Sequence, residues 1–185
     1  GGDSYSSLDQ MACQIRGLLS YGLSGMPFGS HDVGGFDYPP QAFDHSQRGV
    51  KWFLDESAPD PQVYVRWLQF GVFSSHIRAH GKQPREPWEY GSEAEEISRR
   101  YLRLRYRLLP YLYTAFWQAT QTGLPMMRPL SLSYPDDIRT YSLDDQYLFG
   151  DALLAAPVGR PGQRSRRVYL PGGTWYDFWT GERLS

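Results

Sequence analysis

The feature of this sequence that most constrains its fold is an alternation of helix, short apolar run and polar loop that occurs twice. A helix is predicted over residues 7–19, because its apolar side chains recur at helical spacing. Ser7 and Gln10 fit a capping box at its start. A buried strand is expected next, ending in a glycine-rich loop that holds His31 and Asp32. This order predicts an α/β unit with a parallel sheet.

The second unit begins with a helix predicted over residues 61–73. Asp60 is its candidate N-cap, and Pro61 occupies the first helical position, where a missing amide hydrogen does no harm. A short strand is expected to follow and to end in the polar residues Arg78 and His80. Two or three such units cannot close a barrel of eight strands, so the first part of the chain is interpreted as part of a (β/α)8 barrel.

The most regular helix is predicted from about residue 93 to residue 120. Ser92 is expected to cap it, acidic residues fill its first turn, and a continuous apolar stripe follows. Pro110 lies inside this stretch and is expected to kink the helix. Gly123 is expected to end it.

The character of the sequence changes after Gly123, where short apolar segments alternate with turn residues. This pattern predicts antiparallel β structure, with a hairpin turn at residues 171–173. We therefore expect two domains, the second of them antiparallel and starting near residue 125 to 140.

Composition excludes several classes of function. The net charge is −1 and no basic stripe is present, which argues against binding to nucleic acid. A single cysteine excludes an internal disulfide framework, and the 4 histidines show no zinc-like spacing. No apolar run approaches the roughly 18 residues of a membrane span. We expect no metal and no cofactor; the compartment stays open, with the cytoplasm slightly favoured.

Polar residues at the predicted strand ends are the candidates for a functional site. In a parallel barrel the strand ends converge on one mouth, so Asp3, Asp32 and His80 would meet there. Each has an ordinary explanation when taken alone. Asp3 is more simply a helix-flanking acid, His31 and Asp32 could form a turn pair, and His80 could be a structural histidine. Aromatic residues make up 16% of the chain and suit both core packing and stacking on sugar rings.

Long motifs in the same order resemble the catalytic domain of glycoside hydrolase family 31. They are GGDSYSSLDQMACQIRGLLSYGLSGMPFGSHDVGGFDYPP, YVRWLQFGVFSSHIRAHG, PREPWEYG, LRYRLLPYLY and LPMMRPL. Two later segments, DQYLFGDALLAAPV and YLPGGTWYDFWTG, resemble the β-sandwich that follows the barrel in that family. Residues 39–57 look like an insertion. The resemblance implies the last units of a (β/α)8 TIM barrel in residues 1–124, its carboxyl-terminal portion, followed in residues 125–185 by the beginning of an antiparallel β-sandwich.

The resemblance also implies roles for four residues. Asp3, in the family's G-D motif, is similar to the general acid/base. Asp32 and Phe36, in the H-D-x-G-G-F motif, correspond to a residue that orders the sugar subsite and a ring that packs beside it. His80, in the R-x-H motif, resembles the histidine that hydrogen-bonds sugar hydroxyls. The implied partner is an oligosaccharide or α-glycoside substrate, and an oligomer is possible in a full-length enzyme.

Retaining glycoside hydrolysis explains why carboxyl groups are needed. One carboxylate attacks the sugar, and a second carboxyl group, about 5 to 5.5 Å away, protonates the leaving oxygen and then activates water. In the family the nucleophilic aspartate, and an arginine that grips the sugar, lie upstream of the G-D motif, and this sequence contains neither. We expect the 185-residue chain alone to be inactive.

The function expected from these motifs is that of a fragment of a retaining exo-acting α-glycoside hydrolase. GGDSYSS, GSHDVGGF and FSSHIRAHG look closer to the family's α-xylosidases than to its α-glucosidases, which more often carry T-G-D-N, F-W-G-x-D and R-x-H-N. An α-glucosidase and a non-catalytic carbohydrate-binding protein are the alternatives. Trp52 and Phe53, in the insertion, are expected to form part of a lid over the site.

Overall fold

The computed structural model describes residues 3–37, 60–82 and 84–184. Gly2 of the G-D motif, the expected insertion at 39–57 and its proposed lid residues Trp52 and Phe53 lie outside the described residues.

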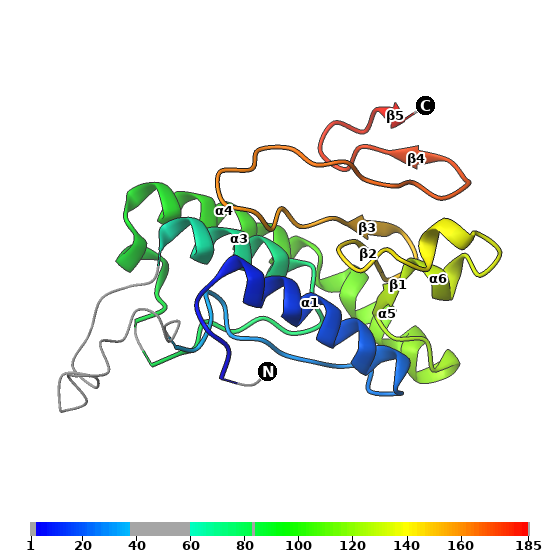
Figure 1. Cartoon of the computed structure of the whole chain (residues 1–185), viewed down its shortest axis with the longest axis horizontal. Coiled ribbons are helices and arrows are strands. Elements are labelled where there is room, and N and C mark those ends of the chain that lie inside the picture. The colour runs from blue at the N-terminus through cyan, green and yellow to red at the C-terminus, as the bar shows by residue number, and fades with distance from the viewer. Residues whose placement is uncertain (1–2, 38–59, 83, 185) are drawn as a thin grey trace.

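Three helices lie side by side and form the main layer of the first part of the chain (Figure 1). They are α1 (Leu8–Leu23), α3 (Pro61–Val72) and α4 (Ser92–Arg107). The predicted caps of the first two are confirmed. The Ser7 hydroxyl accepts a hydrogen bond from the amide of Gln10 at 3.2 Å, and the Asp60 carboxylate accepts from the amides of Gln62 and Val63. Local side chains therefore satisfy amides that a helix start leaves without partners.

The single long helix predicted over 93–120 is two helices. The first, α4, ends at Arg107, and α5 (Leu109–Thr122) begins so that Pro110 lies in its first turn, where proline is tolerated. Gly123 ends α5 in the left-handed region, at φ 74°, as predicted. The expected cap is wrong by one residue: Ser92 is already helical, and Gly91 precedes it, after the short 3-10 helix η3 (Pro87–Tyr90).

The two buried strands predicted before Asp32 and Arg78 are not regular strands in the described residues. Residues 3–6, 31–37 and 76–82 are instead irregular segments, joined by single parallel bridges between Tyr5 and Asp37 and between Asp32 and Arg78. Before Asp32 in the sequence, the Ser75 hydroxyl accepts a hydrogen bond from the amide of Gly29 and donates one to its carbonyl. These two backbone groups are therefore not available for pairing with another strand. The parallel order of the three segments is nevertheless the order that a (β/α) unit requires.

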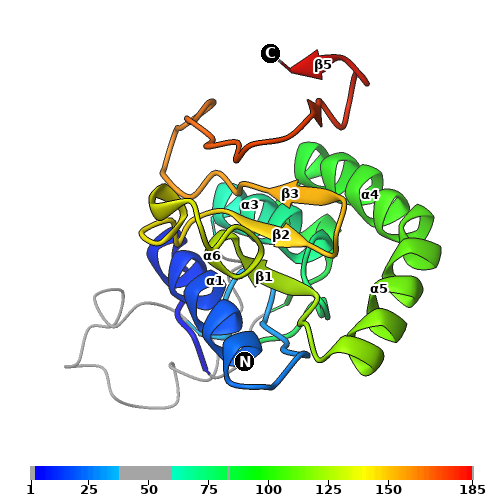
Figure 2. The same cartoon turned by 90° about the vertical axis from the view of Figure 1, so that its right-hand side faces the viewer.

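The antiparallel sheet predicted after Gly123 is confirmed. Its three strands run in the order β1-β2-β3, and Met127 pairs with Phe149 while Tyr147 pairs with Ala155. Figure 2 shows this sheet with α1 to one side and α5 to the other. The elements are β1 (Met127–Pro129), α6 (Leu130–Ser133), the 3-10 helix η4 (Ile138–Thr140), β2 (Tyr147–Phe149) and β3 (Leu153–Ala155).

The last two strands form a hairpin, but not at the predicted turn. Strands β4 (Trp175–Tyr176) and β5 (Arg183–Leu184) pair through a loop that follows β4. The Asp177 carboxylate organises that loop by accepting the amides of Trp179 and Thr180, and Gly181 supplies a positive φ of 75°. The hairpin prediction at 171–173 is therefore wrong.

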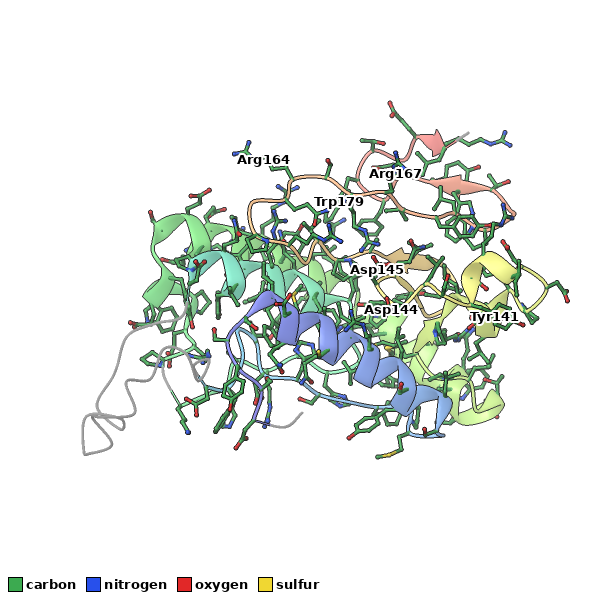
Figure 3. The ribbon with its side chains drawn as sticks, in the orientation of Figure 1. Tyr141, Asp144, Asp145, Arg164, Arg167 and Trp179 are labelled. Atoms are coloured by element: carbon green, nitrogen blue, oxygen red, sulfur yellow. The ribbon has the colours of Figure 1, made fainter. Side chains whose placement is uncertain are left out.

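One core holds the helices and the three-stranded sheet together. Trp67 and Phe70 of α3 are buried in the same cluster as Tyr147 and Phe149 of β2. Ion pairs add to this contact at the surface, where Asp144 and Asp145 lie on the loop before β2 (Figure 3). Arg16 of α1 approaches Asp144 at 2.8 Å, and Arg166 approaches Asp145 at 2.7 Å. Within the described part of the chain, no helix has the length and apolar character needed to cross a membrane.

Candidate active site

The segment that carries Asp3 is hydrogen-bonded along its backbone to the glycine-rich loop. The carbonyl of Ser4 accepts two amides, from Phe36 at 2.7 Å and from Asp37 at 3.1 Å. The amide of Ser6 donates to the carbonyl of Asp37 at 2.7 Å. Main-chain hydrogen bonds alone therefore hold Ser4, the residue after Asp3, beside Phe36.

The loop that carries His80 runs along the other side of the glycine-rich loop. The amide of Val33 donates to the carbonyl of Arg78 at 3.1 Å, and the amide of Lys82 donates to the carbonyl of Phe36 at 2.9 Å. Three segments that are distant in the sequence thus lie next to one another, with the glycine-rich loop in the middle. The convergence expected of barrel strand ends is present in this backbone.

Gly35 is required where the first two segments touch. Its φ is +83°, and a Cβ atom at this position would lie 2.7 Å from the backbone of Ser6 and 2.7 Å from the carbonyl carbon of Tyr5. Any side chain would force the two backbones apart. Glycine is therefore needed both for its conformation and for the close approach.

Asp32 presents a buried carboxylate to this region. Its side chain is only 2% exposed, and the Nε atom of Arg78 lies 2.6 Å from its Oδ1 atom. Among the described residues, Oδ1 therefore has a charged neighbour but accepts no hydrogen bond. A buried acceptor in this state is suited to a donor from a ligand, such as a hydroxyl group.

Phe36 and His80 lie together. Their ring centroids are 5.6 Å apart at an interplanar angle of 38°; Phe36 is half-buried and His80 is exposed. An ion pair between Lys82 and Asp37 lies next to them, and the Lys82 ammonium is 5.9 Å from the centre of the Phe36 ring. The pair offers an apolar ring face and an imidazole at one place, which is what a sugar with one apolar face and several hydroxyls can use.

Asp3 is exposed at one end of this arrangement. The buried hydroxyls of Ser4 and Ser6 beside it have no hydrogen-bond partner among the described residues. The structure therefore brings Asp3, Asp32, Phe36 and His80 onto three adjoining segments, with direct contact between the last two.

His31, next to Asp32, is a structural residue. The Trp67 indole donates to its Nδ1 at 2.9 Å, so the neutral ring carries its proton on Nε2, which lies 3.1 Å from the Ser74 hydroxyl. Phe70 stacks on it with centroids 4.4 Å apart. Burial, followed by nearby positive charges that include Arg105, lowers the pKa of His31 to about 3. The ring therefore stays neutral and holds the backbone from which Asp32 projects.

This pKa predicts a pH-dependent stability. Below pH 6.5 the unfolded chain protonates His31 while the folded protein does not, so the free energy of unfolding should fall as pH decreases from 6.5 towards 3. One proton corresponds to a slope of about 1.4 kcal/mol per pH unit. Denaturant titrations of the full-length protein between pH 5 and 7 measure it. His31→Gln should remove this slope and His80→Gln should keep it; an unchanged slope in the first variant would contradict the assignment.

Two arginines near these loops, the half-buried Arg105 and the buried Arg85, were not singled out from the sequence. Arg105 of α4 donates to the carbonyls of Val72, Ser74 and Ser75, and burial lowers its pKa to about 10. Arg85 bonds the carbonyl of Gly35. The PREPW motif, which contains Arg85, was the only sequence signal that could have drawn attention to this residue. That motif does not reveal a contact partner 50 residues away.

A separate cleft lies between α3 and the carboxyl-terminal hairpin. Its volume is about 900 Å³, and Phe73, Tyr101, Trp175 and Phe178 are among the aromatic residues that line it. None of the four candidate residues lines this cleft. Over residues 3–37, 60–82 and 84–184, no group of three or more His, Cys, Asp or Glu side chains is arranged to hold a metal ion.

Comparison with protein-family models gives two matches that together cover most of the chain. Residues 1–115 match the glycosyl hydrolases family 31 TIM-barrel domain, and residues 123–185 match the glycosyl hydrolase family 31 C-terminal domain. These matches confirm the fold class predicted from the sequence, which is the helical part of a TIM barrel followed by a small antiparallel sheet.

Individual relatives give the same result. The chain is 39% identical to alpha-glucosidase 2 of Bacillus thermoamyloliquefaciens, over 99% of this chain and 21% of that protein. It is 37% identical to an alpha-xylosidase of Saccharolobus solfataricus, over 99% of this chain and 23% of that protein. A family 31 dextranase of Flavobacterium johnsoniae, solved in complex with glucose, superposes with a TM-score of 0.84 at 39% identity, covering 100% of this chain and 22% of that one. The chain therefore spans between a fifth and a quarter of the length of these relatives.

Proposed function

The chain belongs to glycoside hydrolase family 31, and we propose that it supplies the acid/base part of the active site of a retaining exo-acting α-glycoside hydrolase. One observation carries this proposal. The backbone next to Asp3 is hydrogen-bonded to the loop that bears Asp32 and Phe36, and that loop is bonded in turn to the loop that bears His80. A carboxyl group, a buried carboxylate, an aromatic ring and an imidazole thus adjoin one another.

Each of these groups has a task in the proposed reaction. Asp3 donates its proton to the oxygen of the departing group and then takes a proton from the attacking water. The Oδ1 atom of Asp32, which accepts no hydrogen bond from the described residues, accepts one from a sugar hydroxyl. His80 forms a hydrogen bond with a second hydroxyl. Phe36 covers an apolar face of the ring. Hydrogen bonds of this kind accelerate the reaction when they tighten as the sugar flattens towards the oxocarbenium-like transition state.

The second carboxyl group is proposed to come from a preceding segment of a longer protein, since the chain spans only a part of its relatives. We also propose that residues 1–124 belong to the catalytic barrel and residues 125–185 to the β-sandwich. The helix stop at Gly123 and the change to antiparallel pairing after it support this division. The two domains would share a core, because Tyr147 and Phe149 are buried against α3.

For the substrate we propose an α-linked terminal xylose first and an α-linked terminal glucose second. The motifs GGDSYSS, GSHDVGGF and FSSHIRAHG support xylose. The names of the relatives support the α-glycosidase class and include both sugars.

A panel of aryl α-glycosides tests this proposal. The full-length protein is expected to hydrolyse an aryl α-xyloside with a higher kcat/KM than the matching α-glucoside, with retention of the anomeric configuration. Product configuration by NMR and initial rates provide the measurement. Equal or faster turnover of the glucoside would assign the protein to the α-glucosidases. Binding of xylose or glucose without any turnover would support a non-catalytic carbohydrate-binding protein instead.

A further inference from the structure

Arg85 is a buried arginine at the junction of the glycine-rich loop and the His80 loop. The residue is 3% exposed. Its Nε and Nη2 atoms donate to the carbonyl oxygen of Gly35, at 3.0 and 2.7 Å, and Nη2 also lies 3.5 Å from the carbonyl of Phe36. The flat guanidinium fork thus grips one carbonyl with two donors, a geometry that the single ammonium of lysine cannot reproduce.

The backbone around Arg85 is itself fixed from behind. The hydroxyl of Tyr64 on α3 donates to the carbonyl of Arg85 at 2.8 Å, and the hydroxyl of Tyr90 donates to the carbonyl of Pro84 at 3.0 Å. The two tyrosine rings stack on each other with centroids 3.7 Å apart. Both hydroxyls are thereby anchored to the helical layer, so the guanidinium is presented from a rigid support.

The same guanidinium also touches the His80 loop. A Cβ atom on Gly81 would lie 2.8 Å from the Cζ, Nε and Nη2 atoms of Arg85, which means that the backbone at Gly81 passes directly over the guanidinium. At its Nε and Nη2 edge lies the carbonyl of Gly35, whose backbone is packed against Ser6. One side chain therefore bridges the loop with Phe36 and the loop with His80, and through Gly35 it reaches the segment with Asp3.

We propose that Arg85 is a positioning residue for catalysis, which fixes Gly35 and Gly81 so that Phe36 and His80 face the sugar together. This proposal rests on the proposed function. Arg85 itself touches neither substrate nor reacting atoms. Its loss would let the two loops separate, and displacements of about 1 Å in groups that bind a substrate are known to lower rates by up to roughly a hundredfold.

The test uses Arg85→Lys in the full-length protein. The variant is expected to lower kcat/KM for the preferred aryl α-glycoside by roughly 10- to 100-fold, mainly through a higher KM, because the groups that it displaces bind the sugar ring. Hydrogen exchange at the amides of Phe36 and Lys82 is expected to become faster. In Arg85→Ala, added guanidinium ion should restore part of the lost kcat/KM, since it can occupy the site of the missing fork.

Arg128 provides the matched control. It is 5% exposed, lies on β1, donates through Nε to the carbonyl of Pro125 at 2.7 Å and pairs through Nη1 with Asp151, and both of these partners lie outside the two loops. Arg128→Lys should reduce stability to a similar extent while kcat/KM stays within about twofold of wild type. If Arg128→Lys lowered kcat/KM as much as Arg85→Lys does, the role of Arg85 would be merely structural.

A second variant covers the case in which Arg85→Lys does not fold. Gly81→Ala pushes a methyl group against the guanidinium and should lower kcat/KM in the same direction; wild-type kinetics and amide exchange in this variant would overturn the proposal. Wild-type kinetics together with wild-type exchange at Phe36 in a folded Arg85→Lys protein would overturn it as well. Absence of turnover in the wild type would reject the proposed function alone, while the exchange experiment would still decide whether Arg85 fixes the loops.

Discussion

Replacing Asp3 with asparagine should lower kcat/KM for an α-glycoside with a poor leaving group by about a hundred- to ten-thousandfold, the range that general acid catalysis contributes. Asparagine has nearly the same shape but no proton to donate to the leaving oxygen. An aryl glycoside with an acidic phenol needs little protonation, so its first step should be affected far less. Rates measured against leaving-group pKa in the full-length protein give the comparison. Azide, which attacks without a general base, should restore turnover of the acidic aryl substrate.

Asp9 is the control for this experiment, because it is an exposed carboxylate in the first turn of α1, shortly after Asp3. Asp9→Asn should leave kcat/KM within about twofold of wild type, as is usual for surface substitutions. Wild-type hydrolysis of the poor-leaving-group substrate by Asp3→Asn would refute the acid/base role. In that case Asp3 would be no more than a residue beside a helix start.

Replacing Gly35 with alanine should destabilise the protein by about 2 to 5 kcal/mol and abolish activity under conditions where the wild type is active. About 1 to 2 kcal/mol comes from placing a side chain at a φ of +83°. A further contribution of about 1 to 3 kcal/mol comes from the Cβ atom, which would meet the Ser6 backbone at 2.7 Å. Denaturant-induced unfolding of the full-length protein measures the change.

Gly25 separates these two causes. Its φ is +82°, nearly that of Gly35, but a Cβ atom there would meet nothing within 4 Å. Gly25→Ala should therefore lose only about 1 to 2 kcal/mol, and the difference between the two variants reports the contact between the loop and the Asp3 segment. Equal losses in the two variants would mean that this contact contributes nothing to stability.

The helices could be predicted because their signals are local. Ser7 and Asp60 cap helices within three residues of themselves, and Gly123 ends one through its own left-handed backbone. The break between α4 and α5 was harder to place. Pro110 indicated a break, but it lies in the first turn of a second helix and does not kink one long helix.

The two strands expected before Asp32 and Arg78 could not be judged because their partners are remote, and the last hairpin was assigned to the wrong one of two local turn signals. Whether an apolar run forms a ladder depends on what its backbone groups meet, and those of Gly29 meet the hydroxyl of Ser75, 46 residues away. At the carboxyl-terminal end, proline and two glycines at 171–173 indicated a hairpin. The turn is formed instead by Asp177, whose carboxylate binds two amides of the loop.

The candidate residues could be proposed from the sequence, but the side chain that holds their loops together could not. Asp3, Asp32, Phe36 and His80 stand in motifs that can be recognised along the chain, and their adjacency followed from the expected order of parallel segments. Arg85 donates to the carbonyl of Gly35, which is 50 residues away in the sequence, and no local pattern predicts that hydrogen bond.

The Ser4 carbonyl, which accepts two amides of the glycine-rich loop, has a consequence for how this site could change its specificity. The frame of the site is made of main-chain hydrogen bonds, glycines and the Arg85 guanidinium, none of which depends on the identity of the side chains at positions 36 and 80. Those two positions can be randomised together in a library without dismantling the frame. If the site binds a sugar as proposed, such a library should alter which sugar ring it accepts while the backbone stays in place.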